Sequence, residues 1–344
     1  TNSITALAAT NVTGGSGNDT VAFSADTAYT GTIALAAGTN VITLASESDI
    51  GGATVTATDG TINFTIASGT SVTMDDATHD LLVAGTLTAG GTETITISDA
   101  ATITTDTLIE NYSVAEGAAV TLGTTSGSLA QVITETGNDG TVSTFTLGAG
   151  TYTGDWVGID GTDVVEVVDG TNIAGNTGLD AGATIDFQGV TATATLNDTQ
   201  NGVVTFANVG ANTQTVSISA VDTFTTVNTI ETYSGIGGGT VTLGASHAAA
   251  NITMDNTAAT TLNVGAQTVT GTYSLGHGSD VLKVTADADI SGINTGGVTT
   301  AETLDVSTVD TINTTMTEAQ YEGFTTITAA NDNDTITIAD GAIT

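Results

Sequence analysis

Apolar and polar residues alternate in short runs along most of the chain. Runs such as "TIALAAGTNVITLA" at residues 32–45 and "TINFTIASGTSVTM" at residues 61–74 place apolar side chains between Thr or other polar residues. This period of two is typical of half-buried β-strands, and the intervening Gly, Asn and Asp residues are typical of turns. No window shows the sustained three- and four-residue apolar spacing of an amphipathic helix. The pattern therefore predicts an all-β protein with short strands.

The strands and turns recur as an internal repeat. The segment "TETITISDAATITTDTLIENYS" at residues 92–113 aligns without a gap with "TQTVSISAVDTFTTVNTIETYS" at residues 213–234, at an offset of 121 residues. A second kind of segment, residues 147–167, parallels residues 264–284 at an offset of 117. Shared Tyr, Glu and Gly-x-Asp positions in one order indicate a true repeat rather than scattered matches between Thr-rich segments.

Short strands with small side chains suit a Thr/Gly-rich β-solenoid, like a parallel β-helix or β-roll, in which each coil buries its inward side chains on the next. The hydrophobic content of 39% can form a core, and the aromatic content of 4% means that Val, Ile, Leu and Ala build most of it. Tandem β-sandwich modules are the alternative, because the long repeat period also fits separate modules. The expected repeat units, which also fit one continuous solenoid, are residues 1–123, 124–244 and 245–344.

The charge balance excludes several partners. The chain has 37 acidic residues against one basic residue, Lys283, and a formal net charge of −36. Nucleic acid is excluded because no basic residues are present to neutralise its phosphates. Electrostatic binding to an anionic membrane is disfavoured for the same reason, and no apolar run long enough for membrane insertion is present. The surplus carboxylates instead favour divalent cations, whose binding reduces the repulsion among them.

Motifs of known enzyme classes are missing from the sequence. Cysteine is absent, there are three histidines, and neither Gly-x-Ser-x-Gly nor His-Glu-x-x-His occurs. A lyase acting on polyuronates needs cationic groups to stabilise its intermediate, and one lysine without arginine does not supply them. A polysaccharide hydrolase needs only two carboxylates, so it stays as a minor alternative. We therefore expect that the protein is not an enzyme.

Four turns place an aspartate directly before a strand. The first, "GGSGNDTVAF" at residues 14–23, reads Gly-Gly-x-Gly-x-Asp, and "GHGSDVLKV" at residues 276–284 repeats Gly-x-Gly-x-Asp. The turns in "GIDGTDVVEV" at residues 158–167 and "NDNDTITI" at residues 331–338 end in the same way with fewer glycines. Glycine permits a tight backbone, and carboxylate and carbonyl oxygens are the ligands of Ca²⁺. A simple Asx–Gly turn before a strand is the alternative.

These turns resemble the calcium-binding nonapeptide of RTX proteins, and the Thr/Gly-rich repeats resemble bacterial surface-layer and repeat adhesin proteins. The resemblance implies Ca²⁺ as the cofactor. In that family the turns stack in tandem, whereas here there is one per repeat, so a distant group, water or another subunit would have to complete each site. The implied metal ligands are Gly14, Gly15, Gly17, Asp19, Gly158, Asp160, Asp163, Gly276, Gly278, Asp280, Asp332 and Asp334.

Two other acidic stretches are weaker metal candidates. "MDDATHD" at residues 74–80 clusters three aspartates with His79, and we expect a solvated acidic loop there, with a divalent-metal site as the alternative. "DADISG" at residues 287–292 begins like an EF-hand loop, but Val298 stands where the closing glutamate is needed.

The expected function is structural. We expect a secreted, extracellular or cell-surface protein that assembles with copies of itself into a surface layer or filament stabilised by Ca²⁺. Residues 1–21 and 325–344 both read as strand and turn, which favours head-to-tail or lattice contacts between copies. Cell-surface polysaccharide is a further candidate partner. The alternative is a stalk, spacer or binding segment of a large calcium-dependent adhesin.

Overall fold

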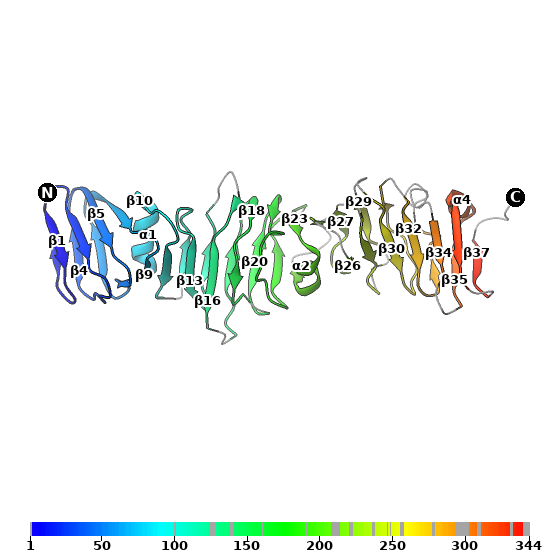
Figure 1. Ribbon diagram of the computed structural model, residues 1–344, viewed down its shortest axis with the longest axis horizontal. Helices are drawn as coiled ribbons and strands as arrows, with labels where there is room; N and C mark the ends of the chain where they lie inside the picture. The colour runs from blue at the N-terminus through cyan, green and yellow to red at the C-terminus, as the bar shows by residue number, and fades with distance from the viewer. Residues whose placement is uncertain are drawn as a thin grey trace. The chain divides into compact units, whose positions relative to one another are not determined.

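Short parallel strands stack coil on coil in the computed structural model, and few helices interrupt them (Figure 1). The fold is a β-solenoid, which confirms the prediction made from the alternating pattern. Contacts divide the chain into two compact units. The structure describes residues 2–99, 101–123, 128–137, 140–159, 161–189, 191–207, 214–219, 223–235, 238–245, 247, 249–254, 258–276, 279–293, 303–307, 311–330 and 333–339.

Unit 1 comprises Thr1–Val167 and Gly175–Ile185. Its described strands form parallel ladders that run from coil to coil. One ladder runs through β1 (Ser3–Ala6), β3 (Thr20–Phe23), β5 (Gly38–Leu44), β8 (Gly60–Ile66) and β10 (Leu87–Thr88), and a shorter one through β2 (Val12–Thr13), β4 (Thr32–Leu35) and β7 (Thr54–Ala57). A third ladder runs through β6 (Ser48–Asp49), β9 (Ser71–Met74), β11 (Thr94–Ile97), β13 (Asn111–Ala115), β16 (Val132–Thr136) and β19 (Trp156–Val157). A fourth runs through β12 (Thr102–Thr104), β14 (Ala119–Thr121), β17 (Thr144–Thr146) and β20 (Val164–Val167), and β15 (Ser128–Leu129) pairs with β18 (Gly150–Tyr152).

Unit 2 comprises Val168–Ala174 and Asp186–Thr344, and β22 (Thr184–Phe187) crosses the boundary in the sequence. Its described ladders are parallel too. One ladder runs through β21 (Thr171–Asn172), β23 (Thr193–Leu196), β25 (Thr215–Ile218), β27 (Thr232–Gly235), β29 (Asn251–Met254) and β31 (Tyr273–Ser274). A second runs through β26 (Thr223–Thr225), β28 (Thr240–Thr242), β30 (Thr261–Val264), β32 (Val281–Val284), β34 (Thr303–Val306) and β36 (Thr326–Ala329). A third runs through β33 (Ala288–Asp289), β35 (Asn313–Met316) and β37 (Thr335–Ile338), and β24 (Thr205–Ala207) is a further strand of this unit.

The register of the ladders places apolar side chains on apolar side chains. In the first ladder Val21 of β3 pairs with Ile42 of β5, which pairs with Phe64 of β8, and all three are fully buried. Each such side chain contributes about 1.5–3 kcal/mol on burial. The residues on either side of each, which are mostly polar, are less buried, so the period of two in the sequence corresponds to the inside and outside of the solenoid.

Three described helices lie in the coils, in addition to the strands that the sequence predicts. They are α1 (Asp76–Ala84), α2 (Asp198–Val203) and α4 (Glu318–Gly323). Helices α2 and α4 begin with capping boxes, in which Gln200 and Gln320 bond the backbone of the N-cap residue. The same Gln320 side chain donates to the carbonyls of Ile290 and Ile293, both at 2.9 Å, so the cap also joins the helix to another coil.

The internal repeat has a structural counterpart. The Tyr112 hydroxyl accepts a hydrogen bond from the backbone N–H of Asp106 at 2.8 Å, and the Tyr233 hydroxyl accepts one from Val227 at 2.9 Å. Two threonine–glycine hydrogen bonds of 3.0 Å are related in the same way, Gly123 to Thr105 and Gly244 to Thr226. The repeated tyrosine therefore holds the turn that precedes its own strand.

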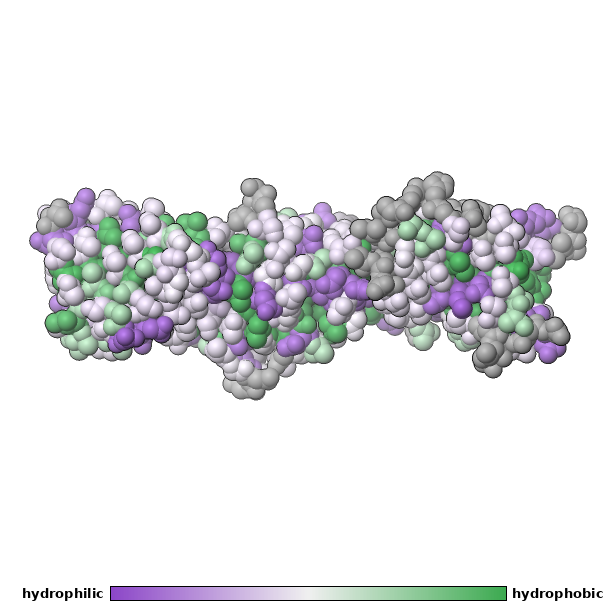
Figure 2. Space-filling view, viewed as in Figure 1, coloured by the Kyte–Doolittle hydropathy of each residue, from purple (hydrophilic) through white to green (hydrophobic). Residues whose placement is uncertain are grey.

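The surface in the view of Figure 2 is mostly of intermediate hydropathy, with hydrophilic and hydrophobic patches scattered over it. Outward Thr and Ser side chains of the strands have this intermediate character. Across the described ranges, every helix is too short or too polar to cross a membrane.

Candidate functional site

The turn that best matches the calcium motif closes around Asp19. This aspartate precedes β3 and is 1% exposed. Its carboxylate accepts hydrogen bonds from the backbone N–H of Gly15 at 2.8 Å and from the backbone and side-chain nitrogens of Asn2 at 2.8 and 2.9 Å. A Cβ on Gly14 would lie 2.7 Å from Oδ2 of Asp19. The first glycine therefore makes room for the carboxylate, and the second donates to it.

Gly17 lies at the contact with the next coil. A Cβ on Gly38, whose φ is +119°, would come within 2.8 Å of the Gly17 carbonyl group. On the same side, the backbone N–H of Asp19 donates to Oδ1 of Asn40 at 3.0 Å. The glycines and the aspartate of this turn thus join three successive coils.

The other three motif aspartates occupy the same kind of position. Each stands directly before a strand, and each accepts a hydrogen bond from the backbone N–H of a residue about 20 positions earlier, in the preceding coil. The donors are Ser143 to Asp163 at 2.9 Å, Thr260 to Asp280 at 2.7 Å and Ile312 to Asp334 at 3.1 Å. The shared role of the motif aspartate is therefore to bond the coil before it at the entry of a strand.

The motif glycines Gly158 and Gly276 have φ values of +90° and +96°, a region that favours glycine. Asp19 and Asp163 bond different coils of unit 1, and Asp280 and Asp334 bond different coils of unit 2. Three predicted ligands, Asp160, Gly278 and Asp332, lie outside the described residues. In the part of the chain that the structure describes, no group of three or more His, Asp or Glu side chains is arranged to hold a metal ion.

One motif aspartate faces a second carboxyl group that sequence reasoning missed. Glu135 ends the inward-facing row of β16 and is 6% exposed, and Asp163 is 2% exposed. The Ser143 hydroxyl donates to Oε1 of Glu135, while the backbone N–H of the same serine bonds Asp163. Burial raises the pKa of Glu135 to about 7, and the hydrogen bond from Ser143 opposes this shift. The charge of Asp163 and a side-chain hydrogen bond between the two carboxyl groups add to the shift.

The two acidic stretches outside the motif also form hydrogen bonds that stabilise the fold. "MDDATHD" is mostly helix α1 rather than the expected solvated loop: Asp75 is its N-cap and accepts from the Thr78 N–H at 2.9 Å. His79 is fully buried, and its Nε2 lies 3.1 Å from the Tyr112 hydroxyl. In the second stretch, Asp287 accepts from the backbone N–H of Asn313 at 2.8 Å.

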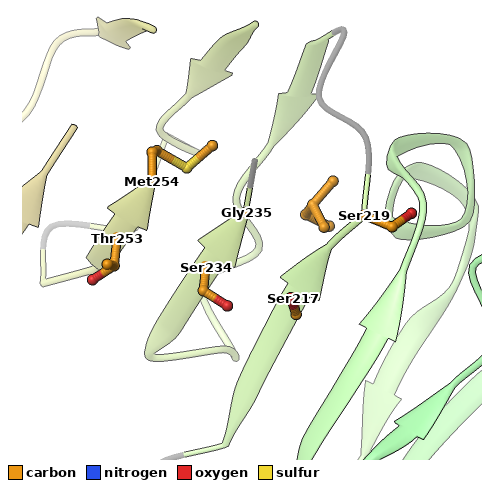
Figure 3. Close-up of a pocket in the computed structure, with 7 residues that line it drawn as sticks. Ser217, Ser219, Ser234, Gly235, Thr253 and Met254 are labelled. Carbon is orange, nitrogen blue, oxygen red and sulfur yellow. The ribbon is translucent and has the colours of Figure 1, made fainter. Parts of the chain in front are cut away.

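A shallow groove of about 430 Å³ lies at the ends of β25, β27 and β29 in unit 2. Figure 3 shows the hydroxyl side chains of Ser217, Ser234 and Thr253 on three neighbouring strands. Gly235 stands between Ile218 and Met254 in the ladder, so the groove opens where a side chain is missing. The described residues that line the groove carry no titratable group.

Comparison with known proteins gives no relative. No protein-family model, curated protein or solved structure matches the chain.

Proposed function

We propose that the chain is a structural scaffold of an extracellular surface layer or filament, which associates with copies of itself and is stabilised by Ca²⁺. The observation that carries this proposal is the use of buried polar side chains as links between coils. Asp19, Asp163, Asp280 and Gln320 are at most 2% exposed, and each bonds the backbone of another coil. These hydrogen bonds form only when the coils are stacked, and buried polar groups that are fully hydrogen-bonded make a structure rigid. A rigid coil stack favours a structural role for the chain.

The charge of the chain supports a role for cations in assembly. Copies that each carry a formal charge of −36 repel one another, and one lysine per copy does not offset the repulsion. Divalent cations bound to carboxylates on neighbouring copies reduce that repulsion.

A ladder edge is the contact that we propose for a second copy. Among the described residues β36 has one ladder neighbour, β34, and all four of its residues are exposed. The β36 sequence Thr-Ile-Thr-Ala resembles the Ser-Ile-Thr-Ala of β1. A β1 strand from a second copy would therefore continue the ladder with Ile4 on Ile327. Exposed strand edges are templates for such pairing.

Electron microscopy and sedimentation of the purified chain, with Ca²⁺ or with a chelator, test the proposal. We expect ordered layers or filaments with Ca²⁺ and dispersed chains without it. Ile327→Lys places a charge on an edge side chain that is 37% exposed and should prevent assembly. Leu108→Lys, at a side chain that is 52% exposed in a loop of unit 1, is the matched control and should assemble. Chains that stay dispersed with Ca²⁺ contradict the proposal.

A further inference from the structure

We propose that Glu135 and Asp163 together bind one divalent cation, Ca²⁺, inside the coil stack of unit 1. This inference rests on the proposed stabilisation by Ca²⁺ and names a site where the ion acts. It gives a ligand role to Glu135, which lies outside every Gly/Asp turn of the sequence.

The geometry leaves one oxygen of Glu135 in need of a positive partner. Oε1 receives the hydrogen bond from the Ser143 hydroxyl, and that hydroxyl in turn accepts from the backbone N–H of Gly117 at 2.8 Å. Oε2 is buried without a hydrogen-bond donor among the described residues. A buried carboxylate oxygen without a donor is costly unless a cation or a proton occupies it.

The chain itself has no cation to place there. Arginine is absent, and the single lysine, Lys283, pairs with Asp305 in unit 2, with Nζ 3.3 Å from Oδ2. The described histidines are engaged elsewhere, His79 with Tyr112 and His247 with Thr226. Two neighbouring buried carboxyl groups cannot both ionise without a counter-charge. The pair is therefore relieved either by a proton that the two carboxyl groups share or by a cation from solution, and the proposal is that the cation takes this place.

The donor set favours Ca²⁺ over other cations. The side chains at the site offer carboxylate and hydroxyl oxygens, which are ligands for hard cations. Ca²⁺ accepts irregular arrangements of about 6–8 oxygens, with carbonyls and water completing the set, whereas Mg²⁺ demands near-octahedral geometry and gives up its water reluctantly.

Unit 2 provides an internal comparison. Glu135 is the ladder partner of Val114, and Met254 is the ladder partner of Gly235. Val114 and Gly235 are equivalent at the repeat offset of 121 residues. Unit 2 therefore has a methionine where unit 1 has the second carboxylate, so the carboxyl pair is specific to unit 1. The same comparison provides a substitution, Glu135→Met, that the fold accommodates elsewhere.

Luminescence of Tb³⁺, which substitutes for Ca²⁺, tests the site directly. Trp156 is the only tryptophan of the chain and is the ladder partner of Ile133, two residues before Glu135. Two residues along a strand correspond to about 7 Å, close enough for the indole to transfer excitation to a bound ion. We expect tryptophan-sensitised Tb³⁺ luminescence that saturates and that Ca²⁺ displaces. We also expect Ca²⁺ to raise the unfolding temperature.

Two variants separate the site from its surroundings. Glu135→Gln and Glu135→Met should each weaken Tb³⁺ binding at least tenfold and lose the Ca²⁺-dependent rise in unfolding temperature. Glu166→Gln, on strand β20 directly after Asp163, makes the same chemical change at an outward position and should bind like the wild type. Having both variants guards against a folding defect in one of them.

Two results would overturn the inference. One is Tb³⁺ affinity in Glu135→Gln equal to that of the wild type. The other is a wild type without sensitised luminescence and with an unfolding temperature that Ca²⁺ leaves unchanged, which would mean that a proton alone fills the site. Assembly is measured separately, by electron microscopy and sedimentation. Tb³⁺ binding without layers or filaments contradicts the proposed scaffold function only. Layers or filaments without Tb³⁺ binding contradict the proposed cation site only.

Discussion

Acidification should destabilise unit 1 through His79. Nε2 of His79 lies 3.1 Å from the Tyr112 hydroxyl, which also accepts the N–H of Asp106. Nδ1 is buried without a hydrogen-bond partner among the described residues, so a charged imidazolium would be poorly solvated.

The size of the effect follows from the pKa. Burial lowers the pKa of His79 from 6.5 to about 4, and the charge of Asp106 opposes this shift. Because the folded state prefers the neutral form, the stabilisation is present above about pH 6.5 and is lost as the pH falls toward 4. Linkage then gives a loss of about 2 kcal/mol at pH 5 and about 3 kcal/mol at pH 4.

Urea unfolding at pH 7 and pH 5, followed by the fluorescence of Trp156, measures this loss in unit 1. The free energies of unfolding of the wild type at the two pH values are compared with those of His79→Gln. The glutamine is neutral at both pH values, so the comparison removes the contribution of the other acids from the difference. We expect the wild type to lose about 2 kcal/mol relative to this variant on going to pH 5. His247→Gln in unit 2 is the control. The same pH dependence in wild type and His79→Gln would refute the reasoning.

Two further substitutions test the turns by the unfolding of the whole chain. Asp19→Ala removes the buried acceptor of the N–H groups of Gly15 and Asn2 and should lower the free energy of unfolding by about 2–4 kcal/mol in urea titration; a loss well under 1 kcal/mol would mean that the carboxylate does not hold the turn. Gly158 has a φ of +90°, and a Cβ there would lie 2.7 Å from the Glu135 carbonyl oxygen, so Gly158→Ala should cost about 1–3 kcal/mol. Gly202→Ala in helix α2, where a Cβ would meet open space, should be neutral or stabilising in calorimetry. Equal effects of the two glycine changes would contradict the strain argument.

The solenoid could be predicted because its inside and outside follow the period of two in the sequence. Val21, Ile42 and Phe64 show the reason: each is buried between two less buried neighbours, and each meets an apolar partner in the next coil. The internal repeat could also be recognised in the sequence. Its structural reason is that Tyr112 and Tyr233 each accept the same hydrogen bond from the turn before their own strand.

The helices were missed for a physical reason. Helices α2 and α4 have six residues each, too few to show a helical period. The signal that was present is the capping box, Asn197 with Gln200 and Thr317 with Gln320. Helix α1 has nine residues and an acidic first turn, which reads as a loop unless Asp75 is recognised as an N-cap.

Only the motif aspartates of the candidate site could be predicted from the sequence, because the chemistry of each depends on the coil beside it. Asp19 meets N–H donors from Asn2, 17 positions earlier, whereas Asp163 meets Ser143, 20 positions earlier, and also Glu135. Coil length varies, so no fixed offset in the sequence identifies these neighbours. An aspartate surrounded by donors is already neutralised, and one that faces a second carboxylate needs a positive charge. If Glu135 and Asp163 bind Ca²⁺ as proposed, the second acid of such a site comes from the adjacent coil and has to be sought there rather than within the motif.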